Sequence, residues 1–196
     1  YGTKLRESLG IGVGAKLIYS YLCPSWIVSR FFPGTKGGGA GSSWAVDLSL
    51  LYKAPLRGLQ LGGSLQNFGP SLTFVEGGEH DPLPRTLRLG AAYKILDSRM
   101  NKLTTAVELT KVLVGMRASE LKEEWKDTWK GYGLEYTWYD LISGRVGYFE
   151  DVAGVRIGPT FGAGIQLKDL RFDLGVDSAL YDFPTDKYRF ALSYSF

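Results

Sequence analysis

Apolar residues recur at every second position along most of this chain, and this alternation constrains the fold more than any other feature. Successive side chains of a β-strand point to opposite faces, so a period of two gathers the apolar residues of a segment on one face. Leu134, Tyr136 and Trp138, for example, alternate with Glu135 and Thr137. The chain is therefore predicted to be all-β. About ten segments follow the pattern: residues 9–21, 44–53, 59–66, 87–95, 103–110, 132–138, 142–148, 161–168, 170–177 and 188–196.

Small residues fill the opposite face of these strands, and they decide between two all-β architectures. A soluble β-sandwich would turn that face to water and carry Lys, Glu and Thr on it. Here Gly and Ser take many of the positions, and the chain holds 26 Gly among 196 residues. We therefore expect an antiparallel transmembrane β-barrel whose apolar face meets lipid. Aromatic residues also gather near strand ends, as in an interfacial girdle: Tyr19, Tyr21, Trp44, Tyr52, Tyr93, Trp138, Tyr148 and Tyr188.

The connections between the predicted strands alternate in length. Short joins are expected at residues 53–58, 97–102, 139–141 and 168–169, and long ones at residues 23–43, 67–85, 111–131, 151–158 and 177–187. This alternation gathers the long connections at one end of the strands. Outer-membrane barrels have this arrangement, with short periplasmic turns and long extracellular loops.

The last segment ends on a terminal Phe that is preceded by apolar residues at two-residue steps. It resembles the C-terminal β-signal by which the barrel-assembly machinery recognises bacterial outer-membrane proteins. The resemblance implies that this machinery and outer-membrane lipid are partners of the chain, and that the short turns are periplasmic. The signal residues are Tyr188, Phe190, Leu192, Tyr194 and Phe196.

Four stretches resemble the C-terminal portion of the PorV/PorQ family, which is similar to the FadL fatty-acid channels. They are residues 44–53 (WAVDLSLLYK), 59–70 (LQLGGSLQNFGP), 81–93 (DPLPRTLRLGAAY) and 188–196 (YRFALSYSF). The resemblance implies a FadL-like barrel of about fourteen strands with an N-terminal segment inside it. Because this chain supplies only about ten strands, either the first strands are missing or it is a relative with about ten strands. We favour the first alternative: residues 1–196 are expected to be a single outer-membrane β-barrel domain that lacks its N-terminal strands, with residues 1–8 as a turn leading into the first strand.

The same resemblance implies a function without catalysis. It predicts an accessory or docking component of type IX-like protein secretion in the bacterial outer membrane, with a translocon or secreted cargo as its protein partner. The alternative is a FadL-like channel for the uptake of hydrophobic small molecules. A net charge of +3 from scattered basic residues gives no stripe for nucleic acid, so no nucleic-acid partner is expected.

The polar face carries charges of both signs. A selective channel would be lined mainly by one sign, so mixed signs favour a structural network of ion pairs in the lumen over a substrate path. We predict that network at Lys16, Asp47, Arg88, Glu108, Glu135, Arg145, Arg171, Asp173 and Arg189.

No group of residues indicates catalysis, a metal or a cofactor. The chain has one Cys and one His, Cys23 and His80, in different Gly- and Pro-rich loops. His80 and Asp81 lie near Glu76 and Glu79, but no Ser is placed as a nucleophile and no calcium-loop motif repeats. We therefore predict a protein that is not an enzyme, with no metal and no cofactor.

Two of the predicted loops carry unusual aromatic residues. The loop at residues 25–32 is apolar for an exposed connection, and residues 112–130 contain apolar residues partly at helical spacing, which predicts a short helix. Exposed aromatic clusters often mark interfaces, and the alternative for residues 112–130 is a loop that packs over the mouth of the barrel. The candidate extracellular partner contacts are Trp26, Phe31, Phe32, Trp125 and Trp129.

For one hairpin, the phase of the apolar alternation alone predicts which residues pair across the two strands. A three-residue turn at 139–141 pairs Trp138 with Ile142, Tyr136 with Gly144, Leu134 with Val146 and Glu135 with Arg145. Leu134 should then meet lipid while Glu135 faces Arg145. Exchanging those two charges is expected to recover part of the loss from either single change.

Overall fold

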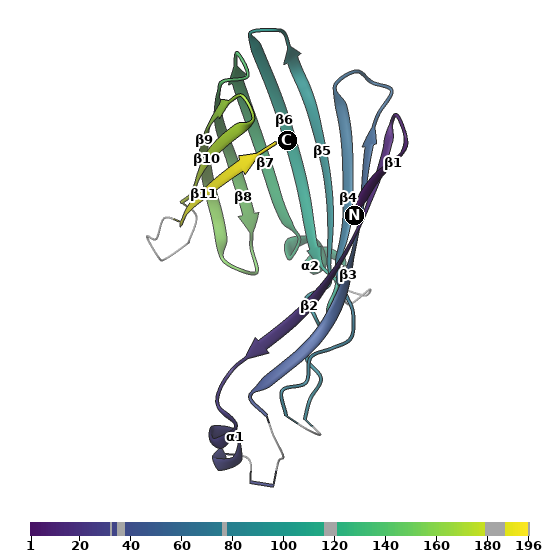
Figure 1. The fold of residues 1–196 in the computed structure, drawn as a ribbon, viewed down its shortest axis with the longest axis vertical. Coiled ribbons are helices and arrows are strands. Elements are labelled where there is room, and N and C mark those ends of the chain that lie inside the picture. Colours follow the sequence, from purple (N-terminus) through teal and green to yellow (C-terminus); the bar gives the residue numbers. More distant parts are fainter. Residues whose placement is uncertain (32, 35–37, 76–77, 116–120, 179–186, 196) are drawn as a thin grey trace. The chain divides into compact units, whose positions relative to one another are not determined.

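The structure is a computed structural model, and it describes residues 1–31, 33–34, 38–75, 78–115, 121–178 and 187–195. These residues form one sheet in which the strands follow one another in chain order (Figure 1). The all-β, antiparallel fold class predicted from the sequence is confirmed. The strands are β1 (Gly2–Arg6), β2 (Leu9–Tyr21), β3 (Ala40–Lys53), β4 (Leu59–Phe68), β5 (Thr86–Asp97), β6 (Asn101–Val112), β7 (Trp129–Trp138), β8 (Ile142–Asp151), β9 (Arg156–Leu167), β10 (Leu170–Asp177) and β11 (Lys187–Tyr194).

Two short helices lie in the connections, α1 (Ser25–Phe31) and α2 (Leu121–Lys126). The short helix predicted within residues 112–130 is therefore confirmed as α2. No helix among the described residues is long and apolar enough to cross a membrane. The chain divides into two compact units, residues 1–50, 63–87 and 112–116, and residues 51–62, 88–111 and 117–196. Strands β7 to β11 lie entirely in the second unit.

Two connections differ from the sequence prediction. Residues 1–8 were expected to be a turn, but β1 pairs with β2, with Gly2 opposite Gly12. All five residues of β1 are exposed, so ladder hydrogen bonds hold the strand where no apolar alternation marks it. The β8–β9 join is also shorter than the predicted 151–158, because Asp151 Oδ1 accepts the Gly154 N–H at 2.8 Å and closes a turn over residues 152–155.

The apolar residues of the sheet are on its exposed face. In β7 and β8 the side chains of Tyr132, Leu134 and Val146 are 49, 39 and 52% exposed, whereas Ser143 on the opposite face is only 8% exposed. This distribution is the reverse of that in a soluble protein and is typical of a barrel that turns its apolar face to lipid. It rules out the sandwich alternative. Only three hydrophobic residues are fully buried among the described ones: Val28, Ala45 and Leu83.

The β7–β8 hairpin has the register predicted from phase. Leu134 pairs with Val146 and Glu135 with Arg145. The turn is closed by the Leu141 N–H, which donates to the Trp138 carbonyl at 2.9 Å. Two residues of this turn have positive φ, Tyr139 at 53° and Asp140 at 56°, a conformation that Asp tolerates better than most residues. The remaining predicted pairs, Trp138 with Ile142 and Tyr136 with Gly144, are present as well.

Candidate functional site

Four charged side chains meet on the polar face of the second unit. Arg145 on β8 donates from Nε to Glu135 on β7, and from Nη1 to Asp173 Oδ1 on β10 at 2.7 Å. Arg171 Nε donates to Asp173 Oδ2 at 2.7 Å, and Arg171 Nη2 lies 4.0 Å from Glu135 Oε2. The cluster balances two cations with two carboxylates. It can therefore hold strands together without favouring ions of one sign.

Glycine makes the Arg145–Asp173 contact possible. Strand β9 runs between β8 and β10, with Gly162 opposite Arg145 and Gly164 opposite Asp173. Adjacent strands lie about 4.8 Å apart, so the Arg145 side chain must cross β9 to reach Asp173. A Cβ atom at Gly164 would lie 2.6 Å from Asp173 Oδ1, so a side chain there would displace the ion pair.

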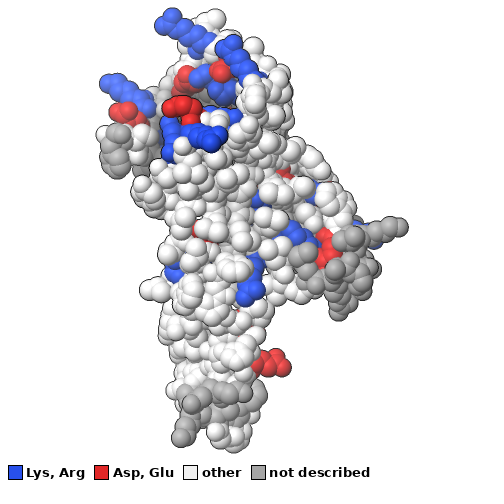
Figure 2. Space-filling view, turned by 90° about the vertical axis from the view of Figure 1, so that its right-hand side faces the viewer, with Lys and Arg blue, Asp and Glu red and all other residues white. Residues whose placement is uncertain are grey.

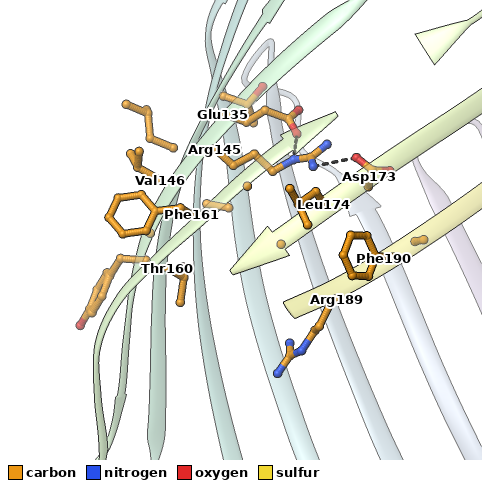
Figure 3. Close-up of a pocket in the computed structure, with 18 residues that line it drawn as sticks. Glu135, Arg145, Val146, Thr160, Phe161, Asp173, Leu174, Arg189 and Phe190 are labelled. Carbon is orange, nitrogen blue, oxygen red and sulfur yellow. Dashed lines mark hydrogen bonds and ion pairs between the residues drawn. The ribbon is translucent and has the colours of Figure 1, made fainter. Parts of the chain in front are cut away.

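A hollow of about 540 Å³ adjoins this cluster. In Figure 3 the Arg145 guanidinium points toward Asp173, whereas Val146 and Phe161 point away from it. Small residues line much of the hollow, including Ala106, Gly147 and Gly175. With its charges already paired, the hollow suits a small apolar group better than an ion.

The other predicted lumen charges form separate pairs. Lys16 Nζ lies 2.9 Å from Asp47 Oδ2 in the first unit, and the amide of Asn67 also donates to Asp47. In the second unit Arg88 Nη2 lies 2.7 Å from Glu108 Oε1. Among the described residues, the predicted charges therefore form separate groups rather than a single network.

Arg189 has a partner that was not among the predicted site residues. Its Nη2 lies 3.5 Å from Asp177 Oδ2, and Arg156 Nη2 lies 2.9 Å from the same oxygen. Lys130 and Glu150 form another pair outside the prediction, at 2.7 Å. The polar-face position of Asp177 was visible in the sequence, but its partners depend on how three strands align.

Residues 34–119 match the family model of the type IX secretion system protein PorV. The resemblance stated from the sequence is confirmed over this part of the chain. The match contains Asp47, Arg88 and Glu108 of the ion pairs, whereas the Glu135–Arg145–Asp173 cluster lies outside the PorV match.

Two further comparisons accompany the PorV match. No curated protein matches the chain. Among solved structures, the toluene transporter TbuX of Ralstonia pickettii is similar, with a TM-score of 0.49 and 12% sequence identity. The similarity covers 91% of this chain and 60% of TbuX, so the chain spans about three fifths of that transporter.

The aromatic residues predicted to contact a partner differ in their surroundings. Trp26 and Phe31 on α1 are 66 and 72% exposed, while Val28 between them is buried and anchors the helix. Trp125 on α2 is exposed, with Lys130 Nζ 5.5 Å from its ring centroid. Trp129 instead packs edge-on against Phe149, which leaves it half-buried. Phe32 lies outside the described residues.

The remaining predicted positions are His80 and the residues of the C-terminal signal. Thr73 Oγ1 and His80 Nδ1 are hydrogen-bonded at 2.7 Å, so a neighbouring hydroxyl holds the single His. No group of three potential metal ligands occurs in the part of the chain that the structure describes. Phe196 lies outside that part, and the other C-terminal signal residues, Tyr188, Phe190, Leu192 and Tyr194, are exposed on β11.

Proposed function

We propose that this chain forms part of an outer-membrane β-barrel that serves type IX-like protein secretion as a docking component without catalytic activity. The observation that carries the proposal is the match of residues 34–119 to PorV. The exposed apolar face supports a membrane location, since exposing such a surface to water would oppose folding. The barrel-assembly machinery would insert the chain, and a translocon or secreted cargo protein would bind it.

The proposed docking surface is the exposed side of α1. Trp26 and Phe31 extend from a helix that Val28 fixes, so they are available without any rearrangement of the helix. Large aromatic side chains of this kind dominate many protein interfaces. In the proposed orientation the long loops, including this one, are extracellular.

Replacing Trp26 and Phe31 by Ser is expected to reduce the recovery of a secretion-system protein with the chain by tenfold or more, an estimate of roughly 1.4 kcal/mol or above. The measurement is affinity purification of tagged chain from its native membrane in mild detergent, followed by mass spectrometry. Tyr139→Ser is the matched control, because Tyr139 is also an exposed aromatic residue but lies on a short turn. Equal recovery with both variants would contradict the docking role of α1.

A tag inserted at Gly34 is expected to bind antibody on intact cells, whereas one at Asp140 should require permeabilised cells. Gly34 has positive φ, and a Cβ atom at this position would have no neighbouring atom within 4 Å, so an insertion there should disturb little. Asp140 lies in the β7–β8 turn. Reversed labelling would invert the proposed topology.

A second candidate function is uptake of hydrophobic small molecules. The hollow of about 540 Å³ beside the charge cluster favours it, because Gly and Ala leave apolar space on the otherwise polar face. Stable retention of a small apolar compound, detected by mass spectrometry of the intact complex, would support this function. Recovery of a secretion protein with no such compound would favour docking.

A further inference from the structure

We propose that a groove at the short-turn end of the second unit binds the phosphate group of an anionic glycerophospholipid. The groove has a volume of about 650 Å³ and lies between the β3–β4 turn and the end of β5. The inference rests on the proposed outer-membrane location, in which this end faces the periplasmic leaflet. It goes beyond that function by naming a lipid ligand and its site.

The charge of the groove favours an anion. Its lining includes Lys53, Arg57 and Lys94 but a single carboxylate, Asp97. Lys94 Nζ is paired with Asp97 Oδ2 at 3.0 Å. Lys53 and Arg57 form no salt bridge among the described residues and remain exposed. Figure 2 shows Lys and Arg side chains at the upper end of the view, with Asp and Glu side chains among them.

The apolar part of the groove favours a lipid over a free anion. Tyr93, Ile95 and Leu56 also line it, and their side chains are 38, 53 and 60% exposed. Tyr93 and Ile95 belong to the apolar face of β5, the face proposed to meet acyl chains. A phosphodiester could therefore contact Lys53 and Arg57 while its acyl chain continues over Ile95. A guanidinium binds phosphate through two parallel hydrogen bonds, and an ammonium acts as a point charge.

The backbone holds the groove in a defined shape. The Lys94 N–H donates to the Gly58 carbonyl at 3.0 Å, and the Ala54 N–H donates to the Leu59 carbonyl at 3.0 Å. Gly58 has a φ of 90°, and a Cβ atom there would lie 3.1 Å from the Lys94 carbonyl oxygen. The turn thus lies close against β5, and the cations project from a fixed frame rather than from a free loop.

The test is a titration of the folded full chain in detergent with phosphatidylglycerol or phosphatidylcholine, with bound lipid counted by native mass spectrometry. We expect tighter binding of phosphatidylglycerol. The double variant Lys53→Gln, Arg57→Gln should weaken it by about fivefold for each cation removed. The matched control, Arg99→Gln with Lys168→Gln, removes two charges from short turns outside the groove lining and should change binding by less than about twofold.

Three results would overturn the proposal. Equal weakening by both double variants would mean general attraction to a basic end, and equal affinity for the two lipids would mean no anion site. Displacement of phosphatidylglycerol by an equal concentration of inorganic phosphate would identify a free-phosphate site without lipid recognition. A heat-modifiable gel shift checks that each variant folds. Failure of the chain to enter membranes would instead count against the proposed function.

Discussion

Replacing Leu134 by Arg is expected to lower the free energy of unfolding of the barrel by about 2 to 4 kcal/mol, the cost of Arg on a lipid face near the bilayer midplane. Leu134 lies midway along β7, and its side chain is 39% exposed on the apolar face. Its cross-strand partner Val146 is exposed on the same face. In the proposed membrane location, a guanidinium at this position would face lipid, and it would have the apolar Val146 rather than a carboxylate opposite it. Urea titration of the refolded chain in lipid vesicles measures the loss.

The control for this change is the neighbouring residue on the other face. Glu135→Gln keeps the size of the side chain, and Arg145 retains its contact with Asp173 at 2.7 Å. Its cost should therefore be smaller than that of Leu134→Arg. If Leu134→Arg proved harmless, or cost less than Glu135→Gln, the assignment of the apolar face to lipid would be wrong.

Replacing Arg145 by Met is expected to cost about 1 to 3 kcal/mol of unfolding free energy. A fully buried ion pair that loses one partner costs about 3 to 5 kcal/mol, and partial solvent access reduces that figure here. The Arg145 side chain is 28% exposed and is the shared cation between Glu135 and Asp173. Met keeps much of the volume but leaves the Glu135 carboxylate without its hydrogen-bonded cation. Asp173 still has Arg171 at 2.7 Å.

The same urea titration measures this loss, with Arg88→Met as the matched control. Arg88 pairs with Glu108 through side chains that are 44 and 48% exposed, so the pair is well solvated. Its removal should cost less than about 1 kcal/mol. Equal losses from the two variants would show that the Arg145 contacts across β9 add no stability.

The structure changes the outcome expected from exchanging the charges of Glu135 and Arg145. The pair alone would tolerate the exchange, but Asp173 lies 2.7 Å from Arg145 Nη1 and would face the new carboxylate. Arg171 would likewise face a new cation, since it lies 4.0 Å from Glu135. We therefore expect little recovery in the double variant Glu135→Arg, Arg145→Glu. The effect of a charge exchange therefore depends on all four residues of the cluster, not on the pair alone.

Local phase was enough to predict the fold class, the exposed apolar face and the β7–β8 register, because alternation and a three-residue turn are properties of neighbouring residues. It was not enough for β1, whose residues 2–6 carry no apolar alternation. It also missed the contact between Arg145 and Asp173. That contact depends on the β8–β9 register, which the turn at 152–155 sets, and the sequence pattern predicts a long loop there.

The aromatic residues of the loops show a different limit of sequence reasoning. Trp125 and Trp129 are four positions apart and looked equivalent, but Trp129 begins β7 and packs on Phe149. An aromatic residue at a strand end can meet either a partner or its own sheet. Only the three-dimensional neighbours distinguish these cases, so Trp26, Phe31 and Trp125 remain the better candidates for docking.

The two ion pairs between β7 and β8 also disfavour misaligned pairing of these two strands during folding. If β7 slipped by two residues against β8, every side chain would keep its own face, and the composition of the apolar face would hardly change. The slip would, however, separate Lys130 from Glu150 and Glu135 from Arg145, which now face each other across the ladder. Hydrophobic burial therefore cannot distinguish the native alignment from this error. The three-residue turn and these charge pairs can, because the slip would change the length of the turn and separate both pairs.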